Sequence, residues 1–164
     1  MVQADTTHAI QLTINGERHE ATVPSRHLLV HFLRDTLGLT GSHVGCEHGV
    51  CGTCSVRLDG VVVRGCLTLA VQCDGHKVET IEGASDSGAL ADLQETFRTR
   101  NALQCGYCTP AMLLTAAELL ARGDVPSRAA IREHLSGNYC RCTGYHAIVD
   151  AVEAVARARA GATS

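Results

Sequence analysis

The sequence predicts an α+β protein in which a small sheet domain, residues 8–82, is followed by a bundle of four helices, residues 89–160. Before residue 82, apolar residues alternate with polar ones, as expected of half-buried strands. After residue 89 they recur at helical spacing in four segments with short connections, which is typical of a helix bundle. Residues 82–88 (Glu-Gly-Ala-Ser-Asp-Ser-Gly) have the composition of a linker and separate the two patterns.

The sheet domain is predicted to begin with a hairpin and a helix. Residues 10–14 alternate apolar and polar side chains, and residues 17–23 form the return strand after Asn15-Gly16, the strongest short hairpin signal. Residues 28–37 carry apolar side chains at helical spacing, and Gly38 is a plausible end of that helix.

A second hairpin and a last strand are predicted to complete the sheet. Residues 55–58 and 61–64 are short strands joined by Asp59-Gly60, and residues 76–81 form the final strand. Two hairpins packed on one helix bury a single apolar face, so these elements form one small domain.

Four helices are predicted in the second half. Residues 89–101 form the first, and Thr109-Pro110 supplies an N-cap and a first-turn proline for the second, which continues to about residue 121. Ser127 caps the third, which ends near residue 135, and residues 146–159 form the fourth.

Composition excludes several classes of protein. A hydrophobic fraction of 45% is that of a globular chain, and a net charge of −3 argues against nucleic acid as the main partner. No apolar run is long enough to span a membrane, and Met1–Thr7 lacks the apolar core of an export signal. We therefore expect a cytoplasmic protein, in which nine cysteines indicate metal binding and not disulfides.

Four of these cysteines have the plant-type spacing of a [2Fe–2S] cluster. Cys46, Cys51 and Cys54 form a C-x4-C-x2-C motif, and Cys66 follows after one hairpin. Three glycines between them are expected to allow left-handed turns and a close approach of backbone N–H groups to sulfur: Gly45, Gly49 and Gly52.

Four more cysteines stand as two pairs in the helical half. Cys105 and Cys108 precede the second predicted helix, and Cys140 and Cys142 precede the fourth. A helix N-terminus favours negative charge, so both pairs suit thiolate ligands. If the two helices lie side by side, the pairs meet at one metal centre.

Other interpretations of these residues compete with iron–sulfur binding. A structural zinc site competes weakly at the first set and about equally at the second. His48 is expected to be a solvated loop residue and Cys73 a small buried apolar residue. Arg64 and Arg141 adjoin ligand cysteines and could tune a cluster potential electrostatically, but a solvated side chain is the default expectation for both. No phosphate-binding loop, dinucleotide motif or catalytic triad is present, so the chain is expected to carry electrons without a substrate site or catalytic residues of its own.

Two further stretches carry a resemblance to a known family. Residues 102–110 (Ala-Leu-Gln-Cys-Gly-Tyr-Cys-Thr-Pro) and 136–145 (Ser-Gly-Asn-Tyr-Cys-Arg-Cys-Thr-Gly-Tyr), together with the first motif, resemble the small iron–sulfur subunit of molybdenum hydroxylases. This is the xanthine dehydrogenase/aldehyde oxidase family in its bacterial three-subunit form, and the resemblance runs from about Ile10 to Val155. It implies a β-grasp, plant-type ferredoxin-like domain followed by a four-helix [2Fe–2S] domain.

The resemblance also implies site residues. One [2Fe–2S] cluster would be held by Cys46, Cys51, Cys54 and Cys66, and a second by Cys105, Cys108, Cys140 and Cys142. Gln104 and Cys142 would contact a molybdopterin, with the cytosine dinucleotide form expected, and residues 47–50 would face an FAD subunit.

The implied function is that of the electron-transfer subunit of a molybdenum oxidoreductase. A large partner would bind the molybdopterin and hydroxylate an organic substrate, with an N-heterocycle or an aldehyde expected. Electrons would pass through the helical-domain cluster, then the ferredoxin-domain cluster, to FAD on a medium partner, in a dimer of heterotrimers. Two alternatives remain at this point: a free-standing two-cluster carrier of the ferredoxin type, and a zinc-binding interaction module.

Overall fold

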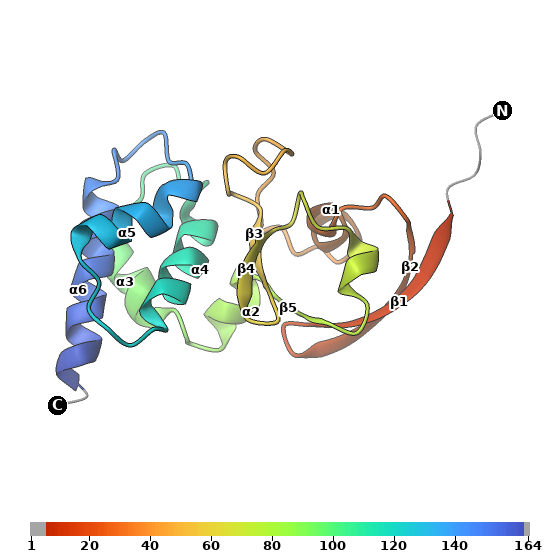
Figure 1. The fold of residues 1–164 in the computed structure, drawn as a ribbon, viewed down its shortest axis with the longest axis horizontal. Helices are drawn as coiled ribbons and strands as arrows, with labels where there is room; N and C mark the ends of the chain where they lie inside the picture. Colours follow the sequence, from red (N-terminus) through yellow and green to blue (C-terminus); the bar gives the residue numbers. More distant parts are fainter. Residues whose placement is uncertain (1–5, 163–164) are drawn as a thin grey trace.

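The computed structural model describes residues 6–162. Residues 1–5, on which the expectation of no export signal largely rests, lie outside the described residues. The molecule is elongated, with the sheet half at one end and the helical half at the other (Figure 1). Within residues 6–162, no helix combines the length and apolar character needed to cross a bilayer.

The first half is a five-stranded sheet of order β2-β1-β5-β3-β4. Its strands are β1 (Thr7–Ile14), β2 (Glu17–Pro24), β3 (Ser55–Leu58), β4 (Val61–Arg64) and β5 (Lys77–Glu79). Both predicted hairpins are present, and their turn residues have positive φ, as type I′ turns require: Asn15, Gly16, Asp59 and Gly60. Strands β1 and β5 pair in parallel, which joins the first hairpin to the second through β5.

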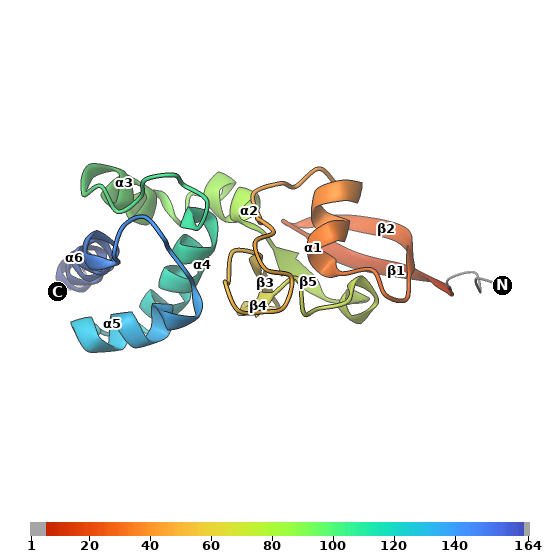
Figure 2. The same cartoon turned by 90° about the horizontal axis from the view of Figure 1, so that it is seen from above.

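One helical segment covers the sheet, as Figure 2 shows from above. It begins as α1 (Leu29–His31) and continues as a π-helix over Phe32–Thr36, where an α-helix was expected throughout. The wider turn is closed by the Leu37 N–H donating to the Phe32 carbonyl at 3.2 Å. Phe32 and Leu33 are fully buried in the sheet core, and Gly38 follows with φ +73°.

All four predicted helices are present in the second half. They are α3 (Ala91–Thr99), α4 (Thr109–Leu120), α5 (Arg128–His134) and α6 (His146–Ala162). Ser127 caps α5 as expected, since its Oγ accepts from the Ala130 N–H at 3.2 Å. The expected cap of α4 is wrong by one residue, because Cys108 and not Thr109 is the N-cap. Helix α4 is buried on most of its surface because it packs between the sheet and the other helices.

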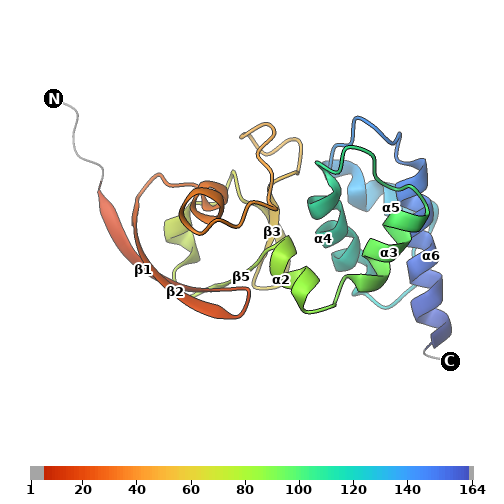
Figure 3. The same ribbon diagram turned by 180° about the vertical axis from the view of Figure 1, so that it is seen from behind.

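The predicted linker is wrong, because most of this segment is helical: it contains α2 (Ile81–Asp86), which was not among the four predicted helices. Ile81 and Ala84 are buried in the core of the helical half. Glu82 reaches the sheet half, where its Oε1 accepts from the Gly41 N–H at 2.8 Å. Figure 3 shows α2 between β5 and α3. Contacts on both sides outweigh the helix-disfavouring Gly-Ser composition of this segment.

Candidate metal centres

The first cysteine set lies on the loop before β3 and at the end of the β3–β4 hairpin. Cys54 immediately precedes β3, and Cys66 follows β4 by two residues. The hairpin brings both buried thiols against Val30, and the Gly65 N–H donates to the Cys54 carbonyl at 3.1 Å. The loop supplies Cys46 and Cys51, where the Cys51 N–H donates to Cys46 Sγ at 3.3 Å.

The glycines of this loop act in two different ways. Gly49 and Gly52 have φ values of +84° and +77°, as expected for left-handed turns. Gly45 is not left-handed. It is needed for close approach, because a Cβ there would lie 3.0 Å from both Cys51 Sγ and Thr53 Oγ1.

The thiols of the first set differ in how easily they ionise. Hydrogen bonds from the backbone of Cys51 and then His48 lower the pKa of Cys46 to about 6. Burial raises the pKa of Cys54 to about 11. Metal binding must therefore supply the free energy that deprotonates the buried Cys54 thiol, as is usual for thiolate ligands.

The second set is assembled by the loops that precede α4 and α6. Cys105 Sγ and Cys142 Sγ lie 3.6 Å apart, and Cys108 adjoins Cys140. Helix α6 packs chiefly against α3 and α5, and the loops before α4 and α6 bring the cysteine pairs together. Tyr145 braces the second loop, because its hydroxyl accepts from the Cys140 N–H at 2.8 Å.

The eight thiols meet in pairs. Within residues 6–162, no three or more His, Cys, Asp or Glu side chains gather as a site for a single ion. The adjoining pairs are Cys46 with Cys51, Cys54 with Cys66, Cys105 with Cys142, and Cys108 with Cys140. A [2Fe–2S] cluster has two irons with two protein ligands each, so a four-thiol set arranged as two pairs fits that group.

The ninth cysteine, Cys73, is apart from both sets. It is fully buried in the sheet core, and burial raises the pKa of its thiol to about 11. This is the expected small buried apolar residue.

The two cysteine loops touch each other directly. The Tyr139 N–H, next to Cys140, donates to the Cys51 carbonyl at 2.8 Å. On the other side, the ring of Tyr107 stacks on His43 at 4.5 Å between centroids, and its hydroxyl donates to the Val44 carbonyl at 2.8 Å. Sequence reasoning missed these contacts, since nothing in either motif shows that it faces the other.

Arg64 is also a contact between the loops, and the expectation that it is solvated is wrong. Its Nη2 donates to the Gly137 carbonyl at 2.7 Å and its Nη1 donates to Ser55 Oγ. Arg141 and His48 are exposed, as expected.

The second site opens to the surface. Cys105 and Cys142 are both exposed, and the Gln104 Nε2 donates to the Cys142 carbonyl at 3.0 Å. The predicted pterin-contacting residues Gln104 and Cys142 therefore lie side by side. Exposed apolar side chains adjoin the cysteine motifs at this end: Leu103, Tyr107 and Tyr139.

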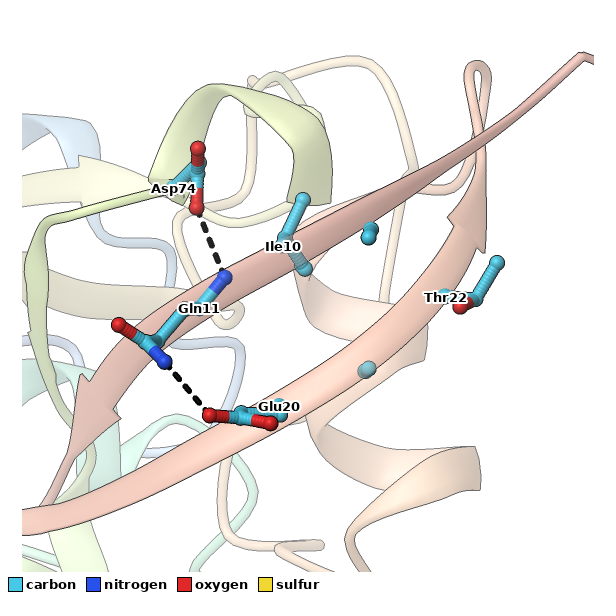
Figure 4. Close-up of a pocket in the computed structure, with 7 residues that line it drawn as sticks. Ile10, Gln11, Glu20, Thr22 and Asp74 are labelled. Atoms are coloured by element: carbon cyan, nitrogen blue, oxygen red, sulfur yellow. Dashed lines mark hydrogen bonds between the residues drawn. The ribbon is translucent and has the colours of Figure 1, made fainter.

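A hollow of about 500 Å³ lies on strands β1 and β2, and none of the eight cysteines of the two sets lines it (Figure 4). The Gln11 N–H donates to Asp74 Oδ1 at 2.7 Å, and its side-chain amide donates to Glu20 Oε1 at 2.6 Å. Both carboxylates thus already hold Gln11, and we assign the hollow no chemistry.

Two family models match the two halves. One, described as "2Fe-2S iron-sulfur cluster binding domain", matches residues 12–72, and another, "[2Fe-2S] binding domain", matches residues 80–153. The first contains Cys46, Cys51, Cys54 and Cys66, and the second contains Cys105, Cys108, Cys140 and Cys142.

Curated proteins and solved structures match nearly the whole chain. Caffeine dehydrogenase subunit gamma of Pseudomonas sp. (strain CBB1) is 50% identical over 152 residues, covering 91% of each chain. The nicotine 6-hydroxylase small subunit of Paenarthrobacter nicotinovorans is 50% identical over 143 residues, covering 87% of this chain and 86% of that one. The crystal structure of quinoline 2-oxidoreductase from Pseudomonas putida 86 matches with a TM-score of 0.85 and 47% identity, covering 93% of this chain and 96% of that one. The chain therefore belongs to the family of small [2Fe–2S] subunits that transfer electrons in molybdenum hydroxylases.

Proposed function

We propose that each cysteine set holds one [2Fe–2S] cluster, the first in a domain of residues 8–82 and the second in a domain of residues 89–160. The observation that carries this assignment is the meeting of the thiols as two pairs in each set. When bound, the clusters supply two one-electron centres that link a molybdenum centre to a flavin. The ligands of the first are Cys46, Cys51, Cys54 and Cys66, and those of the second are Cys105, Cys108, Cys140 and Cys142.

The residues around each site hold the thiolates and set their surroundings. The Cys51 N–H directed at Cys46 Sγ stabilises negative charge on that sulfur. Cys54 and Cys66 are buried, whereas Cys105 and Cys142 are exposed. The two sites therefore differ in solvent access, one of the properties by which a protein tunes cluster potentials.

We assign the exposed end at Gln104 and Cys142 to contact with a molybdopterin, in its cytosine dinucleotide form, on a large partner subunit. The amide of Gln104 is exposed and adjoins the Cys142 backbone, so its free oxygen can accept from a pterin. Residues 47–50, at the first site, face an FAD-binding medium subunit. The assembly is a dimer of heterotrimers in the cytoplasm, where cysteines remain reduced; none of the nine in this chain, all of which the structure describes, forms a disulfide.

The substrate that the large subunit oxidises is an N-heterocycle, with an aldehyde as the second choice. Relatives at 50% identity are named for caffeine and nicotine, and the structural match is named for quinoline. All three molecules are nitrogen heterocycles.

Purification from the native source tests this proposal. We expect a larger and a medium chain to accompany this one, with about four irons per small chain, molybdenum and FAD. A visible spectrum and two reduced-cluster electron paramagnetic resonance (EPR) signals identify the clusters. A colourless chain with stoichiometric zinc would make it a zinc-binding module. A red chain that purifies alone under gentle conditions would make it a free-standing carrier.

A further inference from the structure

One half-buried side chain, Arg64, spans the space between the two cysteine loops. It is the last residue of β4, two residues before Cys66, and its Nη1 donates to Ser55, which follows Cys54. Its Nη2 crosses to the helical half and donates to the Gly137 carbonyl at 2.7 Å, with Asn138 Oδ1 at 3.4 Å. A single guanidinium therefore joins segments that adjoin ligands of both proposed clusters.

The surrounding backbone leaves room for this side chain and for little else. A Cβ at Gly137 would lie 2.6 Å from Arg64 Nη2, and one at Gly52 would lie 3.1 Å from the same atom. Two residues beyond Gly137, the Tyr139 N–H donates to the Cys51 carbonyl. The arginine and the Tyr139–Cys51 hydrogen bond thus hold the same short segment, 137–139, against the first loop.

The charge of this arginine is not neutralised locally. Among the residues that the structure describes, no carboxylate lies within ion-pair distance of Arg64. A half-buried guanidinium without a counter-ion is costly unless negative charge is nearby. The eight thiolates of the two neighbouring cysteine sets would provide that charge.

We propose that Arg64 is a positioning residue that fixes the two cluster loops relative to each other and, through its charge, raises the reduction potentials of both clusters. The inference rests on the proposed function, because it requires two clusters. A guanidinium suits the role, since its rigid fork can donate to Ser55 and Gly137 at once, whereas a lysine ammonium is a compact point charge.

The test compares three variants of the complex purified with its accompanying subunits: Arg64→Met, Arg64→Lys and a control, Arg57→Met. Arg57 is a partly buried arginine of β3 whose Nη1 donates to Glu79 Oε2 at 2.6 Å, within the sheet. The first measurement is the hydrogen-exchange rate of the Tyr139 amide, which reports on its hydrogen bond to the Cys51 carbonyl. The exchange rate of the Val62 amide serves as an internal reference. Val62 also crosses between the halves, donating to Glu118 Oε1 at 2.8 Å, but its contact does not involve the loops.

In the Arg64→Met variant we expect the Tyr139 amide hydrogen to exchange faster and the exchange rate of the Val62 amide to stay the same. An EPR-monitored redox titration should show the reduction potentials of both clusters shifted to more negative values. Arg64→Lys should keep the potentials near those of the unmodified complex while Tyr139 still exchanges faster. Arg57→Met should change neither measurement.

The inference is overturned if Arg64→Met and Arg57→Met give the same Tyr139 exchange and the same potentials. Should Arg64→Met fail to assemble its clusters, Arg64→Lys decides, because unaltered Tyr139 exchange in that variant refutes the positioning role. Failure of the proposed function is separate, since it would show as the absence of two EPR-distinct clusters in the unmodified complex.

Discussion

Replacing Gly52 with alanine should cost roughly 2–5 kcal/mol of unfolding free energy. The backbone at Gly52 has φ +77°, a conformation that costs an L-residue about 1–2 kcal/mol. The new Cβ would also lie 2.4 Å from the Gly137 carbonyl oxygen. That oxygen belongs to the backbone and accepts from Arg64, so relieving the clash separates the loops, with an overpacking cost of about 1–3 kcal/mol.

Gly60→Ala is the matched control. Gly60 has φ +87°, but a Cβ at this position would have nothing within 4 Å, so only the backbone cost of about 1–2 kcal/mol applies. In thermal unfolding of the assembled protein, each kcal/mol lowers the Tm of a chain of this size by roughly 2–4 °C. We expect a fall of roughly 4–20 °C for Gly52→Ala and roughly 2–8 °C for Gly60→Ala. Equal falls in the two variants would refute the argument that contact with Gly137 constrains Gly52.

Three other predictions address the second site and the helical half. Cys108→Ser should abolish one of the two reduced-cluster EPR signals and keep the plant-type signal of the Cys46 loop; loss of both from a folded protein would contradict separate sites. Gln104→Ala should retain both clusters but slow electron entry from molybdenum in the complex, and unchanged turnover would exclude its assigned contact. Asp92→Asn should reduce stability near pH 7, because hydrogen bonds from Arg159 lower the pKa of Asp92. A lowered pKa stabilises the fold above the unfolded value of about 3.8 and loses that effect as pH falls through the folded value, so the deficit measured by denaturant unfolding should shrink below about pH 3.8. A deficit that is constant with pH would contradict this pairing.

Local turn chemistry explains why the hairpins were predictable. Asn15-Gly16 and Asp59-Gly60 can adopt the positive φ values of a type I′ turn at little cost, so the residues themselves determine the connection. Helix 28–37 was predictable in position but not in type. Apolar spacing does not distinguish an α-turn from the π-turn that closes at Phe32.

Contacts between the halves account for the expectations that were wrong. Arg64 ends strand β4, and a solvated side chain is the default expectation there, but its acceptors in the helical half lie 73 and 74 residues further along the chain. The Gly-Ser composition of residues 82–88 indicates a linker only while its tertiary contacts are unknown. The second cysteine set depended on a family resemblance, because its spacing alone fits zinc equally well.

Helix α2 has a consequence for the modularity of this chain. Two family models divide the sequence between residues 72 and 80, as if the halves were exchangeable units. Yet Ile81 and Ala84 complete the helical core, while Glu82 of the same helix accepts from the Gly41 N–H and from the Thr80 hydroxyl on the sheet side. A gene fragment cut on either side of α2 would deprive one half of buried packing or the other of its hydrogen bonds. We therefore expect the two halves to be stable together and neither to be a portable unit by itself.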